Sequence, residues 1–103
     1  MKYEVKITNA ASTDLEEIYY YISKKLHANE SAKELLSKIE VSILRLSDFP
    51  FAYSLVTDDL LREKGYRKLI VGNYIIFYLI DEENRHVLIM RVLYSRRDFK
   101  NLL

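Results

Sequence analysis

The sequence has no cysteine and no tryptophan, and it holds only one proline, two glycines and two histidines among 103 residues. Without cysteine the protein can form neither disulfides nor thiolate metal sites. His27 and His86 fall in different predicted elements without the spacing of metal ligands, so we expect no metal site. Gly65 and Gly72 cannot form a glycine-rich phosphate loop, no nucleophilic triad is recognisable, and no cofactor is expected.

Long apolar runs are also absent. The N-terminal stretch MKYEVKITNAA alternates instead of forming the apolar core of a signal peptide, and no segment approaches the roughly 20 apolar residues of a membrane span. We therefore expect a cytoplasmic protein without a membrane partner. Half of the residues are hydrophobic, and the length suits one domain with a real core, covering residues 1–103.

Charge is nearly balanced overall but unevenly placed. The formal net charge is +1, while residues 62–68 and residues 91–103 each carry +3 and residues 13–48 carry −2, from seven acids and five bases. A dedicated nucleic-acid binder is typically far more basic. This balance permits a local anionic partner at the C-terminal half without requiring one.

The C-terminal half predicts three consecutive strands, at Tyr66–Val71, Tyr74–Ile80 and His86–Tyr94. Gly72-Asn73 is a two-residue hairpin signal, because glycine readily adopts the positive φ that such turns require. Asp81–Arg85 suits a looser hairpin. The middle strand, YIIFYLI, is apolar on both sides, which indicates a central strand covered on both faces.

The N-terminal half predicts a strand at Lys2–Thr8 and then a helix. Thr13 and Glu16 match a capping box, so we expect the helix to begin there. Its apolar stripe recurs at helical spacing, at Leu15, Ile18, Ile22 and Leu26. Tyr19, Tyr20 and Tyr21 are expected to be mostly core or helix-packing residues.

A second helix is predicted from Asn29 or Ser31, where Ser31 and Glu34 again match a capping box. Pro50 is expected to end it, because proline disfavours helix in the preceding residue. Together these elements predict an α+β fold of order β-α-α-β-β-β, with a helical hairpin packed on one face of a mainly antiparallel sheet. No crossover helix fits between the last three strands, which excludes a parallel arrangement for them.

Two further segments lack a clear period. Residues 49–63 are interpreted as a loop that Phe49, Phe51 and Tyr53 anchor to the core, with a helical turn at Asp58–Lys64. The last segment, Asp98–Leu103, is too short for an isolated helix. We expect a short helical turn there, docked through Phe99 and Leu102.

The candidate binding residues are basic or lie beside basic residues, because guanidinium groups donate paired hydrogen bonds to phosphate or carboxylate. They are Arg67, Lys68, Arg91, Tyr94, Ser95, Arg96 and Arg97. The period of two places Arg91 on the side of Val87, Ile89 and Leu93. A purely structural role for Arg67 and Arg91, and a solvated charge run at residues 96–97, are the alternatives. Convergence of these residues requires the first and third meander strands to present them on one surface.

The element order, the early AASTDLEEIYYYI and the stretch GYRKLIVGNYIIFYLIDEENRHVLIMRVLYSRRDF resemble the RelE/ParE superfamily of toxins from bacterial type II toxin–antitoxin modules. The resemblance covers nearly the whole chain. Its most specific parts are YRKL with the tyrosines of the middle strand and the ending VLYSRRD. It implies a small toxin neutralised by a cognate antitoxin, whose acidic C-terminal segment wraps the toxin.

The superfamily has two activities, and the resemblance favours one of them. RelE-like ribosome-dependent mRNA endoribonucleases usually carry an arginine where this chain has Ile75, and some carry a His-Tyr pair where it has Ser95 and Arg96. The ParE-like branch, which acts on DNA gyrase, is closer to Arg91-Val92 and to the ending Arg96-Arg97-Asp98. A non-hydrolytic gyrase inhibitor is therefore favoured, with the ribosome-dependent ribonuclease and a non-toxic protein-interaction module as alternatives.

Overall fold

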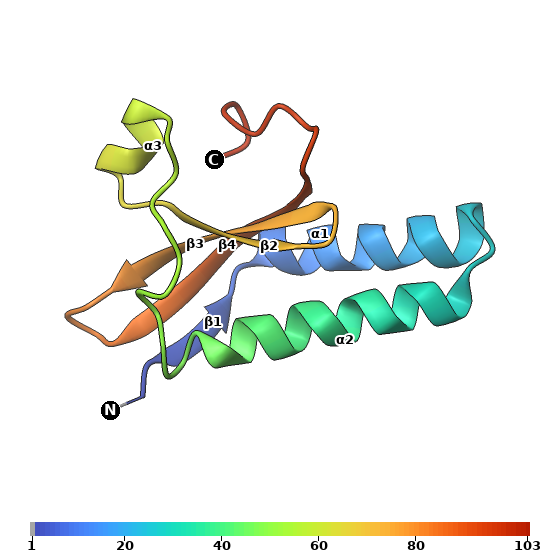
Figure 1. The fold of residues 1–103 in the computed structure, drawn as a ribbon, viewed down its shortest axis with the longest axis horizontal. Helices are drawn as coiled ribbons and strands as arrows, with labels where there is room; N and C mark the ends of the chain where they lie inside the picture. Colours follow the sequence, from blue (N-terminus) through green and yellow to red (C-terminus); the bar gives the residue numbers. More distant parts are fainter. Residues whose placement is uncertain (1) are drawn as a thin grey trace.

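The computed structural model of the protein describes residues 2–103 (Figure 1). Its elements in chain order are β1 (Glu4–Ile7), α1 (Asn9–Tyr20), the π-helical turn η1 (Tyr21–Lys25), α2 (Asn29–Arg45), α3 (Asp59–Glu63), β2 (Arg67–Val71), β3 (Tyr74–Asp81) and β4 (His86–Tyr94). The predicted α+β fold with its helical hairpin and three-stranded meander is confirmed. No helix within residues 2–103 has the length and apolarity to cross a membrane.

The four strands form one open sheet in the order β1-β4-β3-β2. β3 pairs with β2 and β4 in antiparallel fashion, as the meander predicts. β1 pairs with β4 in parallel, from Glu4 opposite His86 to Ile7 opposite Ile89. The hairpin between β2 and β3 turns at Gly72, whose φ of 56° is the left-handed value that glycine adopts without strain.

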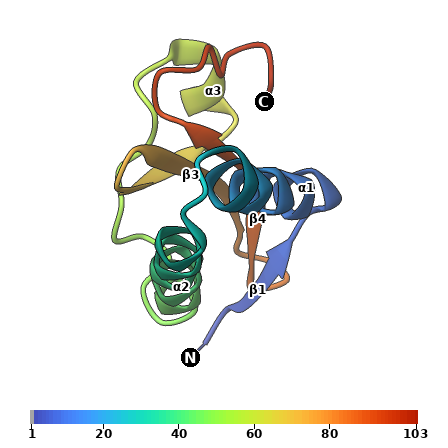
Figure 2. The same cartoon turned by 90° about the vertical axis from the view of Figure 1, so that its right-hand side faces the viewer.

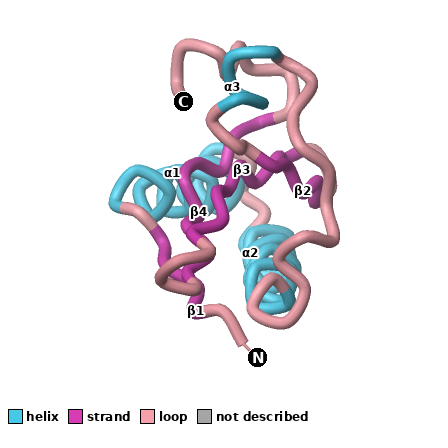
Figure 3. Tube along the Cα trace, turned by 90° about the vertical axis from the view of Figure 1, so that its left-hand side faces the viewer, coloured by secondary structure: helices cyan, strands magenta, loops and turns pink. Residues whose placement is uncertain are grey.

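Both faces of the sheet are covered, so the prediction for the middle strand is confirmed. On one face Ile76 and Tyr78 of β3 pack against α1 and α2, and Figure 2 shows the two helices side by side there. On the other face Ile75 and Phe77 pack beneath α3 and the C-terminal segment, which Figure 3 shows at the same end of the molecule. Successive side chains of a strand point to opposite faces, which is why an unbroken apolar run fits this position.

A β-bulge in β4 overturns one prediction. Arg91 pairs with Phe77 and Ile89 pairs with Tyr78, so the register shifts between these two pairs at Met90. An extra residue in one strand reverses the side to which the following residues point. Arg91 therefore does not share a face with Ile89 as the simple alternation predicts.

The predicted start of the first helix at Thr13 is also wrong. Helix α1 begins at Asn9, where the Thr8 hydroxyl accepts a hydrogen bond from the Ala11 N–H at 3.1 Å. The same hydroxyl lies 2.9 Å from the Ile89 carbonyl oxygen, to which it donates, so the helix start is tied to β4. Thr13 lies inside the helix. Helix α2 begins at Asn29, the first of its two predicted start residues. It has no side-chain cap, so the Ser31 capping box does not form.

Helix α2 ends before it reaches the proline that was expected to end it. The helix ends at Arg45, ahead of Pro50. Beyond it, the Ser47 hydroxyl donates to the Tyr3 carbonyl oxygen at 2.7 Å, and the Tyr3 N–H donates back to the Ser47 carbonyl oxygen at 2.9 Å. These bonds turn the chain toward β1 before the proline is reached.

The loop after α2 is held by a different residue from those expected. Phe49 and Phe51 are 67% and 50% exposed, so the predicted aromatic anchors are wrong. Pro50 is buried instead, and its carbonyl oxygen accepts a hydrogen bond of 2.8 Å from the buried Tyr78 hydroxyl. A polar group taken out of water requires such a partner, which pins the loop at this point.

The two short segments predicted near the end of the chain are present. The Asp58 carboxylate caps α3 by accepting the Leu61 N–H at 3.2 Å. In the C-terminal turn the Leu102 N–H donates to the Phe99 carbonyl oxygen at 2.9 Å. The Phe99 ring lies 4.8 Å from that of Phe77, so this turn is docked on the sheet.

Candidate functional site

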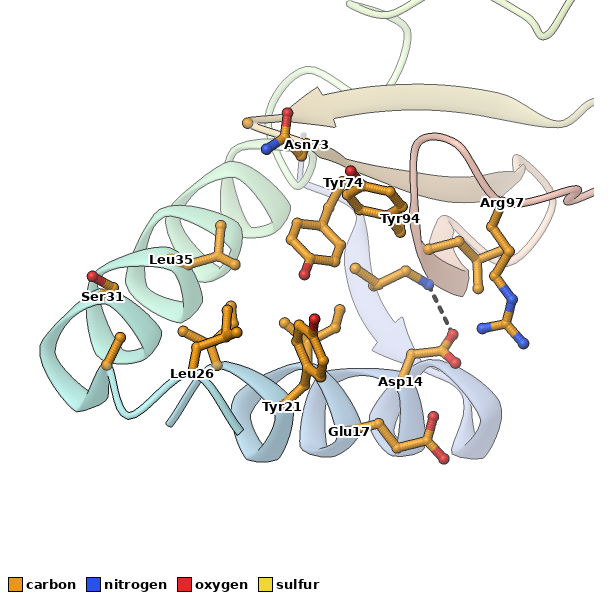
Figure 4. Close-up of a pocket in the computed structure, with 16 residues that line it drawn as sticks. Asp14, Glu17, Tyr21, Leu26, Ser31, Leu35, Asn73, Tyr74, Tyr94 and Arg97 are labelled. Atoms are coloured by element: carbon orange, nitrogen blue, oxygen red, sulfur yellow. Dashed lines mark hydrogen bonds between the residues drawn. The ribbon is translucent and has the colours of Figure 1, made fainter. Parts of the chain in front are cut away.

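The helical hairpin runs past the end of the sheet, on the right-hand side of Figure 1. A groove lies between the hairpin and this end of the sheet. Its volume is about 880 Å³. One wall comes from α1, η1 and α2, and the other comes from the β2–β3 turn and the end of β4 (Figure 4). Its lining residues include Tyr21, Leu26, Leu35, Tyr74, Tyr94 and Arg97.

The helical wall exposes apolar surface. Leu26, which the sequence pattern placed on the buried stripe, is 55% exposed. Tyr21 is 53% exposed, and Tyr19 and Tyr20 are exposed as well, so the expectation of core tyrosines is wrong. The regular helix α1 ends at Tyr20, and the π-helical turn η1 begins at Tyr21. Such turns often occur at functional sites. Exposed apolar side chains gathered in a concave surface indicate a binding site.

The sheet wall is aromatic. The Tyr74 and Tyr94 rings meet edge to face, with centroids 5.8 Å apart. Burial raises the pKa of Tyr74 above its usual value, and the neighbouring phenols of Tyr21 and Tyr94 raise it further. The Tyr74 hydroxyl therefore remains neutral at physiological pH and can donate or accept hydrogen bonds at the groove surface.

The polar end of the groove contains a residue that sequence reasoning did not single out. Asp14 is only 4% exposed and accepts hydrogen bonds from Arg91 Nε at 2.7 Å and Arg91 Nη2 at 2.8 Å. It also accepts the Val92 N–H at 2.9 Å. The hydrogen bond to Asp14 raises the pKa of Arg91. No local signal marked Asp14, because its partners lie far away in the sequence.

Arg91 has a second partner. Its Nη1 donates to the Leu102 carbonyl oxygen at 3.2 Å, which ties the C-terminal turn to β4. The side chain thus connects α1, β4 and the last residues of the chain. This arrangement is that of a structural arginine, the alternative that the sequence left open.

Arg67 and Lys68 lie away from the groove. Arg67 is opposite Tyr78 and Lys68 is opposite Phe77, so their side chains point to opposite faces of the sheet. Arg67 Nη1 donates to the Tyr53 carbonyl oxygen at 2.6 Å, and the guanidinium lies over the Phe51 ring at 5.1 Å. The structure therefore does not bring the basic candidates together on one surface.

The candidates after β4 are divided between the groove and open surface. Tyr94 and Arg97 line the groove, whereas Ser95 and Arg96 are exposed outside it. The Ser95 N–H donates to the Asn73 carbonyl oxygen at 2.8 Å, which holds the end of β4 against the β2–β3 turn. Of the seven predicted site residues, only Tyr94 and Arg97 line the groove.

The groove is suited to binding and carries little acid–base chemistry. Its ionisable groups at the polar end are Asp14, already paired with Arg91, together with Glu17 and Arg97. Within residues 2–103, no three histidine, aspartate or glutamate side chains gather as a metal site would require. Such a surface fits an amphipathic segment that presents apolar side chains to the tyrosines and leucines.

Comparison with known proteins identifies similar sequences and folds. The family described as "ParE toxin of type II toxin-antitoxin system, parDE" matches residues 5–99. No curated protein matches the sequence. A chain in the crystal structure of the toxin–antitoxin complex RelBE2 from Mycobacterium tuberculosis has a TM-score of 0.62 and 24% identity, covering 91% of this chain and 99% of that one. A chain of the chromosomal ParDE system from P. aeruginosa has a TM-score of 0.74 and 18% identity, covering 92% and 98%. At these identities the two structures show a shared fold.

Proposed function

The chain belongs to the ParE toxin family of type II toxin–antitoxin systems, and we propose that it arrests growth by binding a cytoplasmic target such as DNA gyrase until a cognate antitoxin neutralises it. The observation that carries the binding part of this proposal is the apolar groove beside the helical hairpin. A surface with exposed Tyr21 and Leu26 is costly to leave in water, so a partner gains free energy by covering it.

We infer that the antitoxin neutralises the toxin by binding in this groove. We assign it to an amphipathic helix from the C-terminal segment of the antitoxin, whose apolar side chains would contact Leu26, Leu35 and Tyr74. Lys24 and Lys25 end the π-helical turn beside this groove, and Arg97 lies at its other end. These positive charges favour acidic residues on the polar side of the helix.

The surroundings of the basic residues support the proposal that the toxin binds its target without cleaving RNA. Ile75 is 8% exposed and packs on the face beneath the C-terminal segment, so its position offers no group to a phosphate. Arg91 is occupied by Asp14, and Arg67 by the loop at Tyr53. A phosphodiester-cleaving site needs a positioned acid, a base and a group that stabilises developing charge. The arginines left exposed, Arg96 and Arg97, suit recognition of an anionic surface on a target.

The target is tested by direct comparison of two assays. The purified toxin is added to DNA gyrase with relaxed plasmid, and separately to programmed ribosomes with labelled mRNA. We expect loss of supercoiling and intact mRNA. Cleaved mRNA with unaffected gyrase would instead identify a ribosome-dependent ribonuclease, and growth without arrest would identify a non-toxic interaction module.

The groove assignment is tested with the protein encoded beside this gene. Leu26→Asp should abolish its co-purification with the toxin and its relief of growth arrest, because the charge is placed in the apolar wall. Leu44→Asp is the matched control, since Leu44 is similarly exposed, at 58% against 55% for Leu26, but lies outside the groove. Equal retention of the neighbouring protein by both variants would remove the groove from the antitoxin interface.

A further inference from the structure

The loop that follows α2 lies at the end of the molecule opposite the tip of the helical hairpin (Figure 1). It exposes three aromatic residues within five positions, since Phe49 is 67%, Phe51 is 50% and Tyr53 is 38% exposed. None of the three lines the groove beside the hairpin. Large apolar side chains gathered in this way on a surface indicate a contact with a partner.

Hydrogen bonds hold the backbone that carries these rings. Phe49 begins a β-turn in which the Ala52 N–H donates to the Phe49 carbonyl oxygen at 3.2 Å. Pro50 takes the second position of this turn, where its fixed φ is favourable. The buried Tyr78 hydroxyl donates to the Pro50 carbonyl oxygen at 2.8 Å, so the turn is tied to the sheet. A partner therefore has little conformational freedom to remove when it binds Phe49 and Phe51.

Arg67 adds a positive charge to these aromatic residues. Its guanidinium lies over the Phe51 ring at 5.1 Å, and its Nη1 donates to the Tyr53 carbonyl oxygen at 2.6 Å. The bond to Tyr53 fixes the side chain but does not neutralise its charge, and within residues 2–103 Arg67 forms no ion pair. A guanidinium held in this way suits a carboxylate on a partner. We call Phe49, Phe51, Tyr53 and Arg67 the aromatic patch.

The chemistry of the aromatic patch favours a protein partner over a nucleic acid. Aromatic residues and arginine are enriched in the buried centres of protein–protein interfaces. A single-stranded nucleic acid also stacks on aromatic rings, but it needs a positively charged path for its phosphates. Asp48 is exposed and directly precedes Phe49, so its charge would repel such a backbone. A protein surface with apolar pockets and a carboxylate matches the patch.

We propose that the aromatic patch binds the target protein of the toxin, with the Phe49 and Phe51 rings in apolar pockets and Arg67 paired with a carboxylate of the target. This inference rests on the proposed function and names a surface through which the target is held. The patch is separate from the groove assigned to the antitoxin. Variants of the patch should therefore lose the target and keep the antitoxin.

The first measurement is the affinity of purified DNA gyrase for variants of the full toxin. Phe51→Ala should weaken gyrase binding about tenfold or more, as loss of a central aromatic contact does. Tyr20→Ala is the matched control, because Tyr20 is 57% exposed against 50% for Phe51 but lies on α1, outside both the groove and the patch. It should alter gyrase binding less than about threefold. Equal affinities of the two variants overturn the proposal.

Further variants separate a lost contact from a disturbed fold. Phe51→Ala also removes the ring that Arg67 covers. Phe49→Ala avoids this change, so it should keep the melting temperature within a few degrees and still weaken gyrase binding. Arg67→Glu should weaken gyrase binding more than Arg67→Lys, which retains the positive charge. Equal effects of the two Arg67 variants, or full gyrase binding by folded Phe49→Ala, contradict the proposed contacts.

Three other occupants of the patch are distinguished in the same experiments. Loss of the protein encoded beside this gene from Phe51→Ala, with gyrase binding unchanged, would assign the patch to the antitoxin. Loss of a toxin dimer in sedimentation would assign it to a second copy of the chain. Loss of binding to a labelled single-stranded oligonucleotide would assign it to a nucleic acid. Each of these results overturns the proposal.

The outcomes separate this inference from the proposed function. If the unmodified toxin neither binds gyrase nor blocks supercoiling, the proposed target is wrong and this inference fails with it. Inhibition of gyrase that Phe49→Ala and Phe51→Ala leave unchanged overturns the aromatic patch alone. Loss of gyrase binding in both variants, with normal binding of the neighbouring protein, supports both proposals.

Discussion

The carboxylate of Asp14 holds the guanidinium of Arg91 through two hydrogen bonds, of 2.7 and 2.8 Å, although the two residues are 77 positions apart in the sequence. The same carboxylate accepts the Val92 N–H at 2.9 Å. β1 has ended at Ile7, opposite Ile89, so beyond that point the edge of β4 has no strand beside it. Asp14 therefore supplies, from a helix, an acceptor that a neighbouring strand would otherwise provide.

Arg91→Ala should lower the free energy of unfolding by about 3–5 kcal/mol, because it leaves a buried carboxylate without its charge partner. Urea denaturation of the variant measures this loss. The Asp14→Ala single variant and the double variant complete a cycle, and coupling well above about 0.5 kcal/mol is expected for residues in direct contact. A loss below about 1 kcal/mol would show that the pair is not structural.

Arg96→Ala and Arg97→Ala should leave the melting temperature within a few degrees, because both side chains are exposed and surface changes rarely exceed about 0.5 kcal/mol. Both variants are expected to lose growth arrest. Growth curves after induction, with thermal melts of the purified variants, check the two halves of this prediction. Folded variants that retain full toxicity would remove these arginines from the target surface.

Ser23→Ala should stabilise the protein by about 1 kcal/mol. The Ser23 side chain is buried at 4% exposure, and its hydroxyl has no hydrogen-bond partner within residues 2–103. A buried hydroxyl without a partner costs about 1–3 kcal/mol, and alanine also favours helix. Chemical denaturation of the variant beside the unmodified protein measures the change. A destabilised variant would indicate that the hydroxyl has a partner in solution, such as a bound water.

Tyr78 should make the protein sensitive to alkali. Burial raises the pKa of its phenol from 10.0 to about 12. The unfolded chain loses this proton first, so the contribution to stability is complete below pH 10 and is lost as the pH rises from 10 to about 12. Tyr78→Phe should lower the free energy of unfolding by about 1 kcal/mol at neutral pH, because the hydrogen bond to the Pro50 carbonyl oxygen is lost. Above pH 10 the stability of this variant should fall less than that of the unmodified protein.

Denaturation at pH 7 and at pH 11 checks the Tyr78 prediction. Tyr74→Phe is a useful comparison, because burial also raises the pKa of Tyr74 but its ring lies at the groove. The prediction would be contradicted if the Tyr78→Phe variant and the unmodified protein lost equal stability between pH 7 and pH 11.

The local pattern of apolar and polar residues was sufficient to predict the strands and the order of the elements. Period-two alternation predicted β1, and the apolar run of residues 74–80 predicted a central strand. The Gly72-Asn73 pair predicted the tight turn, because a positive φ is a property of the residue itself. Each of these features depends on neighbours in the chain, so the sequence was enough to derive them, and the family resemblance rested on the same stretches.

Tertiary contacts decided the helix boundaries and the site. The Thr8 hydroxyl caps α1 and also bonds to β4, so the helix begins there and not at the local capping box. Helix α2 ends at Arg45, ahead of the proline, and the Ser47 hydroxyl that follows it bonds to Tyr3. The bulge at Met90 reversed the facing of Arg91, since a register shift depends on pairing between strands and not on alternation within one. Leu26 lies on the predicted apolar stripe and is nevertheless 55% exposed, because it lines an open groove and is not packed in the core. A side chain's periodicity is local, but whether a partner stands across from it depends on the packing of the whole chain.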